Sequence, residues 1–391
     1  MDKTIINNII KLHEGYHEEK PEMVVSCGGR FEILGNHTDH NHGLCLASAC
    51  DLEIIATIKG NKSKIVNLKS LGYQGDEIDL SNLEPEMSEK ATSSGLIRGV
   101  ASYLYSHGYK IGGFNAYTYS TIFKGAGVSS SAAFELLVGY IFNILYNGGK
   151  IDTLTLCKAG QYAENEYFGK KSGLLDQIGV AFGGVVSIDF KNVDSPTIEQ
   201  LEFPFKDLHW VIVNTGGDHS SLNDLYSSIP LDMKEAANQM KKRFLGDASL
   251  SELELVKKDL TENQYLRAKH FYQENERVKL AIKALNEKDE SSFLKLINES
   301  RISSTNLLKN MMVGDKYVGS PLEACDLILK ASDNEGACKI NGGGFAGSVI
   351  ALIPSNKFRN VMYTCARKYG DENVKEIFVK KDGPKIINKI E

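Results

Sequence analysis

The sequence lacks the features that mark several classes of protein. Basic residues form no long block in the 391-residue chain, and the formal net charge is -5, so there is no electrostatic footprint for nucleic acid or an anionic membrane. No segment approaches the ~20 uninterrupted apolar residues of a membrane span. The charged N-terminus has no apolar signal-peptide core. We therefore expect a cytoplasmic protein with a small-molecule ligand and with neither a nucleic-acid nor a membrane partner.

The sequence also lacks cysteines spaced as pairs. The seven cysteines are odd in number and scattered, without a C-x-x-C motif, which predicts free thiols in a reducing compartment, most of them in the core. With 42% hydrophobic residues, the chain is long enough for two domains with separate cores. The stretch KNVDSPTIEQLEFPFKD, with its two prolines and mixed charge, is the candidate passage between them. We expect domains at 1–205 and 206–391.

Hydrophobic patterning predicts a mixed α/β chain. EMVVSCGGR reads as a short strand that breaks at Gly28 and Gly29, and GLCLASACDLEIIATIKG reads as one or two further strands. FELLVGYIFNILYN is apolar on every face and predicts a helix buried on all sides. Another helix is expected from an N-cap at Asp152 to Gly169. HWVIVNT predicts a strand, residues 232–335 predict charged amphipathic helices, and GACKINGGGFAGSVIALI predicts strand, glycine loop, strand.

Residues 29–43, GRFEILGNHTDHNHG, allow two interpretations. His37, His40 and His42 have spacing compatible with zinc. The alternative is a loop that recognises a hexose, because Asn36, His37 and Asp39 are short polar side chains able to reach several hydroxyl groups.

The stretch GAGVSSSAA, residues 125–133, predicts an anion site. Gly125 and Gly127 allow a sharp turn, and Ser129, Ser130 and Ser131 begin the buried helix, whose positive dipole end points at the turn. The hydroxyls suit phosphate oxygens, and one of them suits magnesium. The alternative is a glycine turn with serine caps. The G-K-[ST] ending of a Walker A loop is missing.

Two further segments carry candidate chemistry. GGGFAG, residues 342–347, satisfies G-x-G-x-x-G, but a strand-like SVIALI follows where a dinucleotide fold needs a helix. Its backbone must pass close to another strand or to a ligand. In AENEYFGKKSGLLDQIG, Glu164 and Asp176 are acids that need partners if they are buried. Magnesium and a substrate hydroxyl are candidates, and a helix cap or salt bridge is the alternative.

Together these motifs resemble the GHMP small-molecule kinases, and within them the galactokinase group. The resemblance covers nearly the whole chain, in the family's order, and AEN at 163–165, GLLDQ at 173–177 and IRGV at 97–100 also match. It implies a two-domain α/β fold with the active site in a cleft between domains. It further implies a monomer that uses ATP and Mg²⁺ to phosphorylate the anomeric hydroxyl of galactose, giving galactose 1-phosphate.

The resemblance also implies roles for individual residues. Asp176 would accept or orient the hydroxyl proton, and Arg30 would lower the pKa of Asp176 and stabilise charge at the transferred group. The sugar would be bound by Asn36, His37, Asp39, Gly173 and Tyr226. ATP would be bound by Gly125, Gly127, Ser129, Ser130, Ser131, Gly343 and Gly344, and magnesium by Ser131 and Glu164.

The chain departs from the family pattern N-L-I-G-E-H-x-D-Y. Glu32 replaces the usual asparagine, Asn36 the usual sugar-binding glutamate and His40 the usual tyrosine. Phe123 replaces a proline, and an arginine expected after the tyrosine matched by Tyr226 is missing. Because an asparagine is neutral and can also donate, galacturonic acid or another hexose derivative is an alternative substrate. A non-catalytic galactose-sensing homologue is a second alternative.

Overall fold

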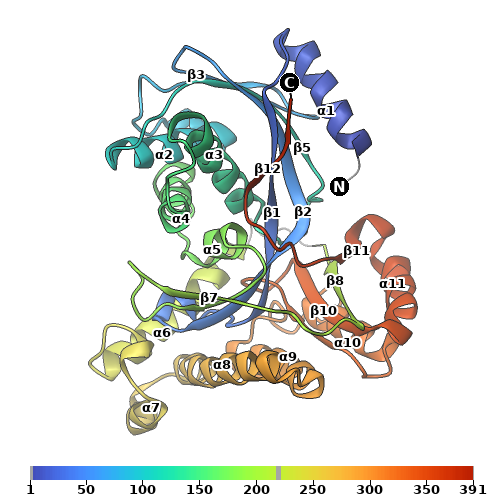
Figure 1. Cartoon of the computed structure of the whole chain (residues 1–391). Helices are drawn as coiled ribbons and strands as arrows, with labels where there is room; N and C mark the ends of the chain where they lie inside the picture. Colours follow the sequence, from blue (N-terminus) through green and yellow to red (C-terminus); the bar gives the residue numbers. More distant parts are fainter. Residues whose placement is uncertain (1–2, 217–221, 391) are drawn as a thin grey trace.

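The computed structural model describes residues 3–216 and 222–390, and it contains two β-sheets with helices on both sides (Figure 1). The strands are β1 Met23–Leu34, β2 Leu44–Gly60, β3 Ile65–Ser70, β4 Asp76–Asp79, β5 Phe114–Ser120, β6 Val185–Asp189, β7 Thr197–Leu201, β8 Leu208–Asn214, β9 Ala337–Ile340, β10 Ser348–Pro354, β11 Val374–Ile377 and β12 Lys385–Lys389. The α-helices are α1 Lys3–His17, α2 Ser93–Ser106, α3 Ser130–Tyr146, α4 Thr153–Tyr162, α5 Leu175–Ala181, α6 Asn223–Gln239, α7 Leu250–Val256, α8 Glu262–Glu287, α9 Glu290–Ser303, α10 Pro321–Ala331 and α11 Ser355–Tyr369. The expected mixed α/β class is confirmed.

The first sheet has the strand order β12-β1-β2-β5-β3-β4, with β6 on β2 and β7 on β6. The expected break of β1 at its two glycines is wrong, because the strand runs on to Leu34 through a register shift between Gly28 and Arg30. A side chain at Gly29 would come within 2.5 Å of the Val128 carbonyl oxygen. The glycines therefore serve close packing, and the strand carries Arg30 and Glu32 toward the second half of the chain.

Helices α2 to α5 cover one face of the first sheet and α1 lies on the other (Figure 1). The prediction of a buried helix after the phosphate-loop motif is confirmed, since α3 buries side chains on every turn from Ala132 to Asn143. The Asp152 side chain caps α4 by accepting from the Thr155 N–H. The helix continues as a π-helical turn over Ala163–Phe168 and ends at Gly169 in the left-handed region, as predicted.

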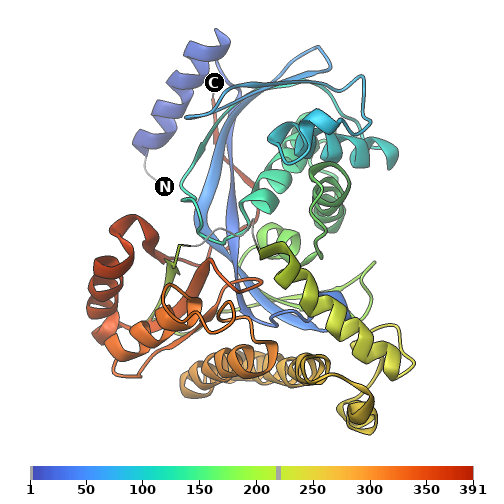
Figure 2. The same ribbon diagram turned by 180° about the vertical axis from the view of Figure 1, so that it is seen from behind.

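The second sheet has the order β11-β8-β10-β9. Helices α10 and α11 pack on one of its faces, and α8 and α9 pack on the other (Figure 2). The α8–α9 side of this core also holds Phe31 and Ile33 of β1. The two halves of the molecule are therefore joined by one shared hydrophobic cluster.

The chain crosses between the halves more than once. The candidate passage contains β7, which extends the first sheet. The last strand, β12, returns to pair with β1 over Met23–Ser26. The division at residue 205 thus stays a prediction, with β12 joining the sheet built by the earlier residues.

All seven cysteines are free and buried, which confirms that they are core residues. Over the residues that the structure describes, no helix is long and apolar enough to cross a membrane.

Candidate active site

Residues from distant parts of the chain meet at Asp176, in the first turn of α5. Arg30 of β1 donates from Nε to Asp176 Oδ1 at 2.8 Å, and its Nη2 lies 2.7 Å from the same oxygen. Asp176 Oδ2 accepts a hydrogen bond of 2.6 Å from Ser129 Oγ, at the start of α3. The structure thus brings together the two predicted catalytic residues and one predicted phosphate-loop serine.

These contacts determine the charge of Asp176. Burial opposes ionisation of the carboxyl group, but the positive charges of Arg30 and Lys170 and the Ser129 hydroxyl outweigh it and lower the pKa of Asp176 below its ordinary value. The carboxylate is therefore ionised at neutral pH. It is well suited to accept a hydrogen bond from a substrate hydroxyl and to orient it.

The second acid, Glu164, is fully buried in the π-helical turn after α4. Its Oε1 accepts from Ser131 Oγ at 2.9 Å and lies 2.7 Å from Lys170 Nζ. Its Oε2 accepts from Ser172 Oγ at 2.5 Å and from Gln177 Nε2 at 3.3 Å. The two predicted magnesium ligands are thus adjacent, and the ammonium of Lys170, a largely exposed side chain, supplies the positive charge beside them.

The predicted phosphate loop is a glycine turn in front of α3. Gly125 and Gly127 have φ values of 80° and 68°, which glycine adopts without strain. Ser130 is exposed at the helix start, and the Gly127 carbonyl accepts from Arg30 Nη1 at 2.9 Å. The turn is therefore attached directly to Arg30, the predicted catalytic arginine.

The histidines of the 29–43 stretch do not converge on one point. His37 Nε2 is hydrogen bonded to the Gly343 carbonyl at 2.9 Å, and His37 Nδ1 lies 3.4 Å from His40 Nε2. His42 turns away and stacks on Phe244 with ring centroids 3.7 Å apart. Within residues 3–216 and 222–390, no three His, Cys, Asp or Glu side chains are grouped to hold a metal. The zinc interpretation therefore has no support from the geometry, since both His37 nitrogens have protein partners.

Burial sets the protonation of this histidine pair. It lowers the pKa of His37 and of His40 to about 4. Both rings are neutral at physiological pH. His40 consequently acts as a neutral support for His37, which has a left-handed backbone with φ 59°.

The third glycine motif is held by side chains that were predicted to bind sugar. Its three consecutive carbonyl oxygens, at Gly342, Gly343 and Gly344, accept from Asn36, His37 and Tyr226 at 2.7, 2.9 and 2.6 Å respectively. Asn310 Nδ2 also donates to the middle carbonyl at 3.1 Å. A side chain at Gly343 would come within 2.6 Å of the Tyr226 ring. The close approach of this loop is therefore made to the predicted sugar-binding residues.

Asn36 is almost fully buried, and its amide is committed to the protein. Both of its N–H groups are used, toward Glu32 Oε1 at 3.0 Å and the Gly342 carbonyl at 2.7 Å. Its Oδ1 accepts from Asn310 Nδ2 at 2.9 Å. The alternative in which Asn36 donates to a sugar acid finds both N–H groups already bonded within the protein, and a sugar contact of Asn36 stays a prediction.

Asp39 lies against Gly173. Any side chain at position 173 would clash with Asp39 Oδ2. Burial raises the pKa of Asp39, while the neighbouring His37 acts in the opposite direction. This contact explains why a glycine stands at 173. A direct sugar contact of either residue stays a prediction.

Sequence reasoning missed Lys339, Asn310 and Lys170. The signal for Lys339 was present, because ACKI has one charge among apolar residues in a predicted strand, and a buried charge needs a partner. That partner is Glu32, with the Lys339 ammonium 2.9 Å from Glu32 Oε1. No local pattern marks Asn310 or Lys170.

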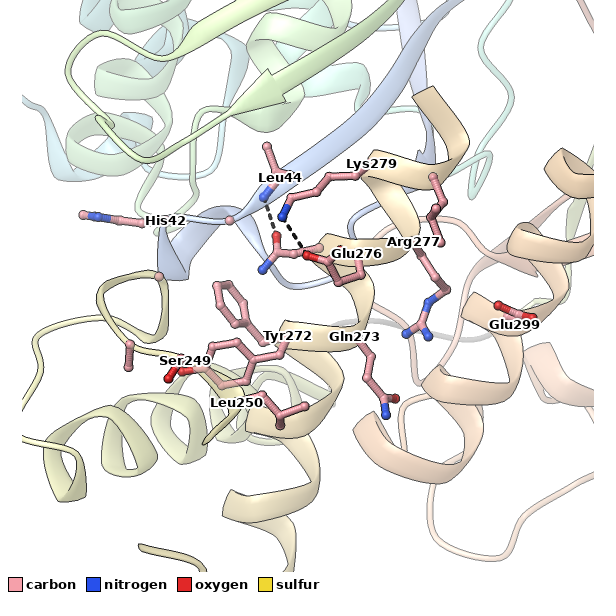
Figure 3. A pocket seen from close by; sticks show the side chains of 16 residues that line it. His42, Leu44, Ser249, Leu250, Tyr272, Gln273, Glu276, Arg277, Lys279 and Glu299 are labelled. Atoms are coloured by element: carbon pink, nitrogen blue, oxygen red, sulfur yellow. Dashed lines mark hydrogen bonds and ion pairs between the residues drawn. The ribbon is translucent and has the colours of Figure 1, made fainter. Parts of the chain in front are cut away.

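A separate groove of about 620 Å³ runs along α8 (Figure 3). It is bounded by Leu44 at the start of β2, by Ser249 before α7 and by Glu299 of α9. None of the predicted catalytic, sugar, nucleotide or magnesium residues lines it. The chemistry is therefore assigned to the convergence around Asp176, where the charged groups meet.

Comparison with known proteins gives matches over this same set of elements. The family model described as the GHMP kinases N terminal domain matches residues 95–184, and the one described as the galactokinase galactose-binding signature matches residues 11–59. A galactokinase from Clostridium tetani is 31% identical over 341 residues, which cover 84% of this chain and 83% of that protein. The chain belongs to the galactokinase family. A second galactokinase, from Fusobacterium nucleatum, is 27% identical over 88% of both chains.

Solved structures agree with this galactokinase-family fold. The crystal structure of Lactococcus lactis galactokinase complexed with galactose matches with a TM-score of 0.83 at 24% identity, covering 97% of this chain and 99% of that one. Mevalonate kinase from Methanococcus jannaschii matches with a TM-score of 0.63 at 17% identity over 94% and 99% of the two chains. The two-domain GHMP kinase fold expected from the motifs is confirmed.

Proposed function

We propose that this chain is an ATP-dependent galactokinase, which transfers the γ-phosphoryl group to the anomeric hydroxyl of galactose. The observation that carries the proposal is the contact of Asp176 with both Arg30 and Ser129. It places an ionised carboxylate between a guanidinium and the phosphate loop. The complete set of catalytic side chains argues against a non-catalytic sensing homologue.

In this proposal Asp176 orients the sugar hydroxyl for attack. Its lowered pKa makes positioning a larger part of its work than proton removal, since phosphoryl transfer demands mainly in-line geometry and charge neutralisation. Arg30, which also donates to the Gly127 carbonyl, stabilises charge on the transferred group. The exposed Ser130 and the turn at Gly125 and Gly127 hold phosphate oxygens.

Magnesium is proposed to bind at Ser131 and Glu164. A hydroxyl and a carboxylate suit a hard cation, and the Lys170 ammonium beside Glu164 already occupies the place of a positive charge. The bound ion would neutralise charge on the ATP phosphates. Because most of the Lys170 side chain is exposed, it can move away when the ion binds.

ATP consumption measured against a panel of monosaccharides tests the proposal. Galactose should be consumed with formation of galactose 1-phosphate, and glucose and mannose should react far more slowly. A folded protein that binds galactose but consumes no ATP with any sugar would favour the sensing alternative.

A further inference from the structure

A serine, a histidine and a glutamate are hydrogen bonded in series on the second sheet, where α11 begins. Nδ1 of His209, in β8, lies 2.7 Å from Oε1 of Glu376, in β11. The other ring nitrogen, Nε2, lies 2.9 Å from Oγ of Ser355, the first residue of α11. This connectivity is that of a nucleophile, a base and an acid that orients the base.

The sheet register brings the histidine and the glutamate together. β8 and β11 are antiparallel, with Val211 opposite Glu376. His209 lies two residues before Val211, so the side chains of His209 and Glu376 are diagonal neighbours on one face of the sheet. The His209 ring also stacks on Phe358 of α11, with ring centroids 4.5 Å apart. The imidazole is therefore oriented by the carboxylate and by the aromatic ring.

These contacts decide which histidine nitrogen can act as a base. A carboxylate can only accept, so the neutral imidazole carries its hydrogen on Nδ1 and presents Nε2 as an acceptor to Ser355. The Asp207 carbonyl oxygen also lies 3.0 Å from the Ser355 hydroxyl, but it already accepts the Ser355 N–H at 2.9 Å. The nearer of the two acceptors is the imidazole, which can take the hydroxyl proton.

The serine is open to solvent and lies where negative charge is favoured. Ser355 is exposed, and the side chains of His209 and Glu376 are 29% and 27% exposed. Over the residues that the structure describes, no side chain caps the start of α11, a 15-residue helix with Pro354 at its N-cap. The N–H groups of its first turn are therefore available to charge that develops on an acyl oxygen.

We propose that Ser355, His209 and Glu376 form a second catalytic site, which hydrolyses small esters with good leaving groups. Ser355 Oγ attacks the ester carbonyl carbon, and its proton passes to His209 Nε2. As the bond from that carbon to the leaving oxygen breaks, this oxygen takes the proton from Nε2. Because the three side chains lie at the surface, they hold a substrate weakly, so the reactivity of the ester decides more than its shape.

Water completes the reaction. It attacks the acyl carbon of the acyl-serine and gives a proton to His209 Nε2. The bond from the acyl carbon to Ser355 Oγ then breaks, Oγ takes the proton back, and a carboxylic acid is released. In both steps the Glu376 carboxylate stabilises the imidazolium that forms.

This site is separate from the convergence at Asp176. β8, β11 and α11 belong to the second sheet and its outer helices, whereas Asp176 lies in α5, which covers the first sheet. Figure 1 shows α11 and β11 at one side of the molecule and α5 near its centre. Failure of the ester hydrolysis would therefore leave the proposed kinase function in place, and the reverse also holds.

The first test treats the native protein with a fluorophosphonate, which forms a phosphorus–oxygen bond to an activated serine as fluoride leaves. Peptide mass spectrometry should locate the label on Ser355. Ser249, an exposed serine before α7 whose hydroxyl is bonded to Glu252, is the internal control and should stay unlabelled. A label absent from Ser355, or equal on both serines, would overturn the inference.

The second test follows the release of p-nitrophenolate from p-nitrophenyl acetate. Ser355→Ala should reduce the rate to that of the non-specific reaction with surface amines. His209→Gln stays polar but cannot take a proton, so the rate should fall by about 10²-fold or more. Glu376→Gln can still bond to Nδ1 without the charge and should cost about 10-fold or more.

Ser249→Ala is the matched control variant and should keep the native rate. A native rate in Ser355→Ala would assign the hydrolysis to other groups, and a native rate in His209→Gln would mean that the serine is not activated. Either result would overturn the inference. Thermal unfolding checks that each variant is folded, and if His209→Gln does not fold, the labelling of the native protein still decides.

Discussion

At the scale of single residues, the ionised Asp176 is the group on which turnover should depend most. Asp176→Asn keeps the shape and removes the charge that faces Arg30 and Ser129. Turnover should fall by roughly 10²–10⁴-fold, with the KM for sugar largely retained. Steady-state kinetics of the folded variant checks this. Asp152→Asn is the matched control, because asparagine also caps a helix well and Asp152 caps α4. Near-normal turnover of Asp176→Asn would exclude the assigned role.

Glu164 and Lys170 allow a residue-scale test of the magnesium site. Glu164→Gln keeps the side-chain shape but loses the charge, so the Mg²⁺ concentration for half-maximal activity should rise by about 10-fold or more. Direct Mg²⁺ titration of the protein with a non-hydrolysable ATP analogue gives a second readout. Lys170→Ala removes the ammonium beside Glu164 and should lower the Mg²⁺ requirement or leave it unchanged. A rise of similar size in both variants would contradict the assignment.

At the scale of elements, α8 supports the predicted sugar-binding loop, which follows β1 at residues 35–43, through a polar face buried in the core. Its Glu274 accepts from the Gly35 N–H at 3.0 Å, and His270 is hydrogen bonded to the Asn36 carbonyl at 3.0 Å and to Ser303 Oγ at 2.8 Å. The pKa of Glu274 is about 2, because burial, which opposes ionisation, is outweighed by Arg277 and His270. The loop is therefore held by one charged and one neutral group of the same helix.

Burial lowers the pKa of His270 to about 4, and this predicts how stability depends on pH. The unfolded chain takes up the proton below its pKa of about 6.5, whereas the folded chain does so only near the lowered value, so stability falls as pH drops from about 6.5 toward 4. His270→Gln should reduce the loss of unfolding free energy between pH 7 and 5 by about 2 kcal/mol. Urea denaturation at both pH values measures it.

Ser303→Ala is the control for this helix. It removes the same hydrogen bond without removing a titrating group, so it should lower stability equally at both pH values. A pH dependence of His270→Gln identical to that of the native chain would mean that His270 does not titrate in this way.

At the scale of the whole molecule, the last strand closes the edge of the first sheet. β12 pairs with β1 over Met23–Ser26, and the rest of β1 leads to Arg30. Deleting the chain from residue 385 onward should expose the β1 edge, lower the Tm by roughly 5 °C or more and promote association. Thermal unfolding and size-exclusion chromatography measure both effects. Lys389→Ala, at an exposed position of the same strand, should leave the Tm unchanged, and an equally stable truncated protein would contradict the role given to β12.

Local pattern determined much of this protein. The buried α3, the Asp152 cap, the strand that excludes a dinucleotide fold after GGGFAG and the candidate pair of Asp176 and Arg30 all follow from periodicity, turn chemistry or motif. Each depends on neighbours within a few residues, or on a motif long enough to be specific, so the signal is present in the linear chain.

Only the tertiary structure decided which groups far apart in the sequence become hydrogen-bond or ion-pair partners. Lys339 and Glu32 are 307 positions apart, and Asn36 and Asn310 are 274 apart. Whether Asn36 offers a donor or an acceptor depends on which buried neighbours consume its hydrogens. β1 likewise runs unbroken through its two glycines, where the backbone of Cys50 in β2 lies against Gly28 and Val128, in the turn before α3, lies against Gly29. Hydrogen-bond capacity and close packing are properties of the assembled site, and a buried amide has no free orientation until its partners are in place.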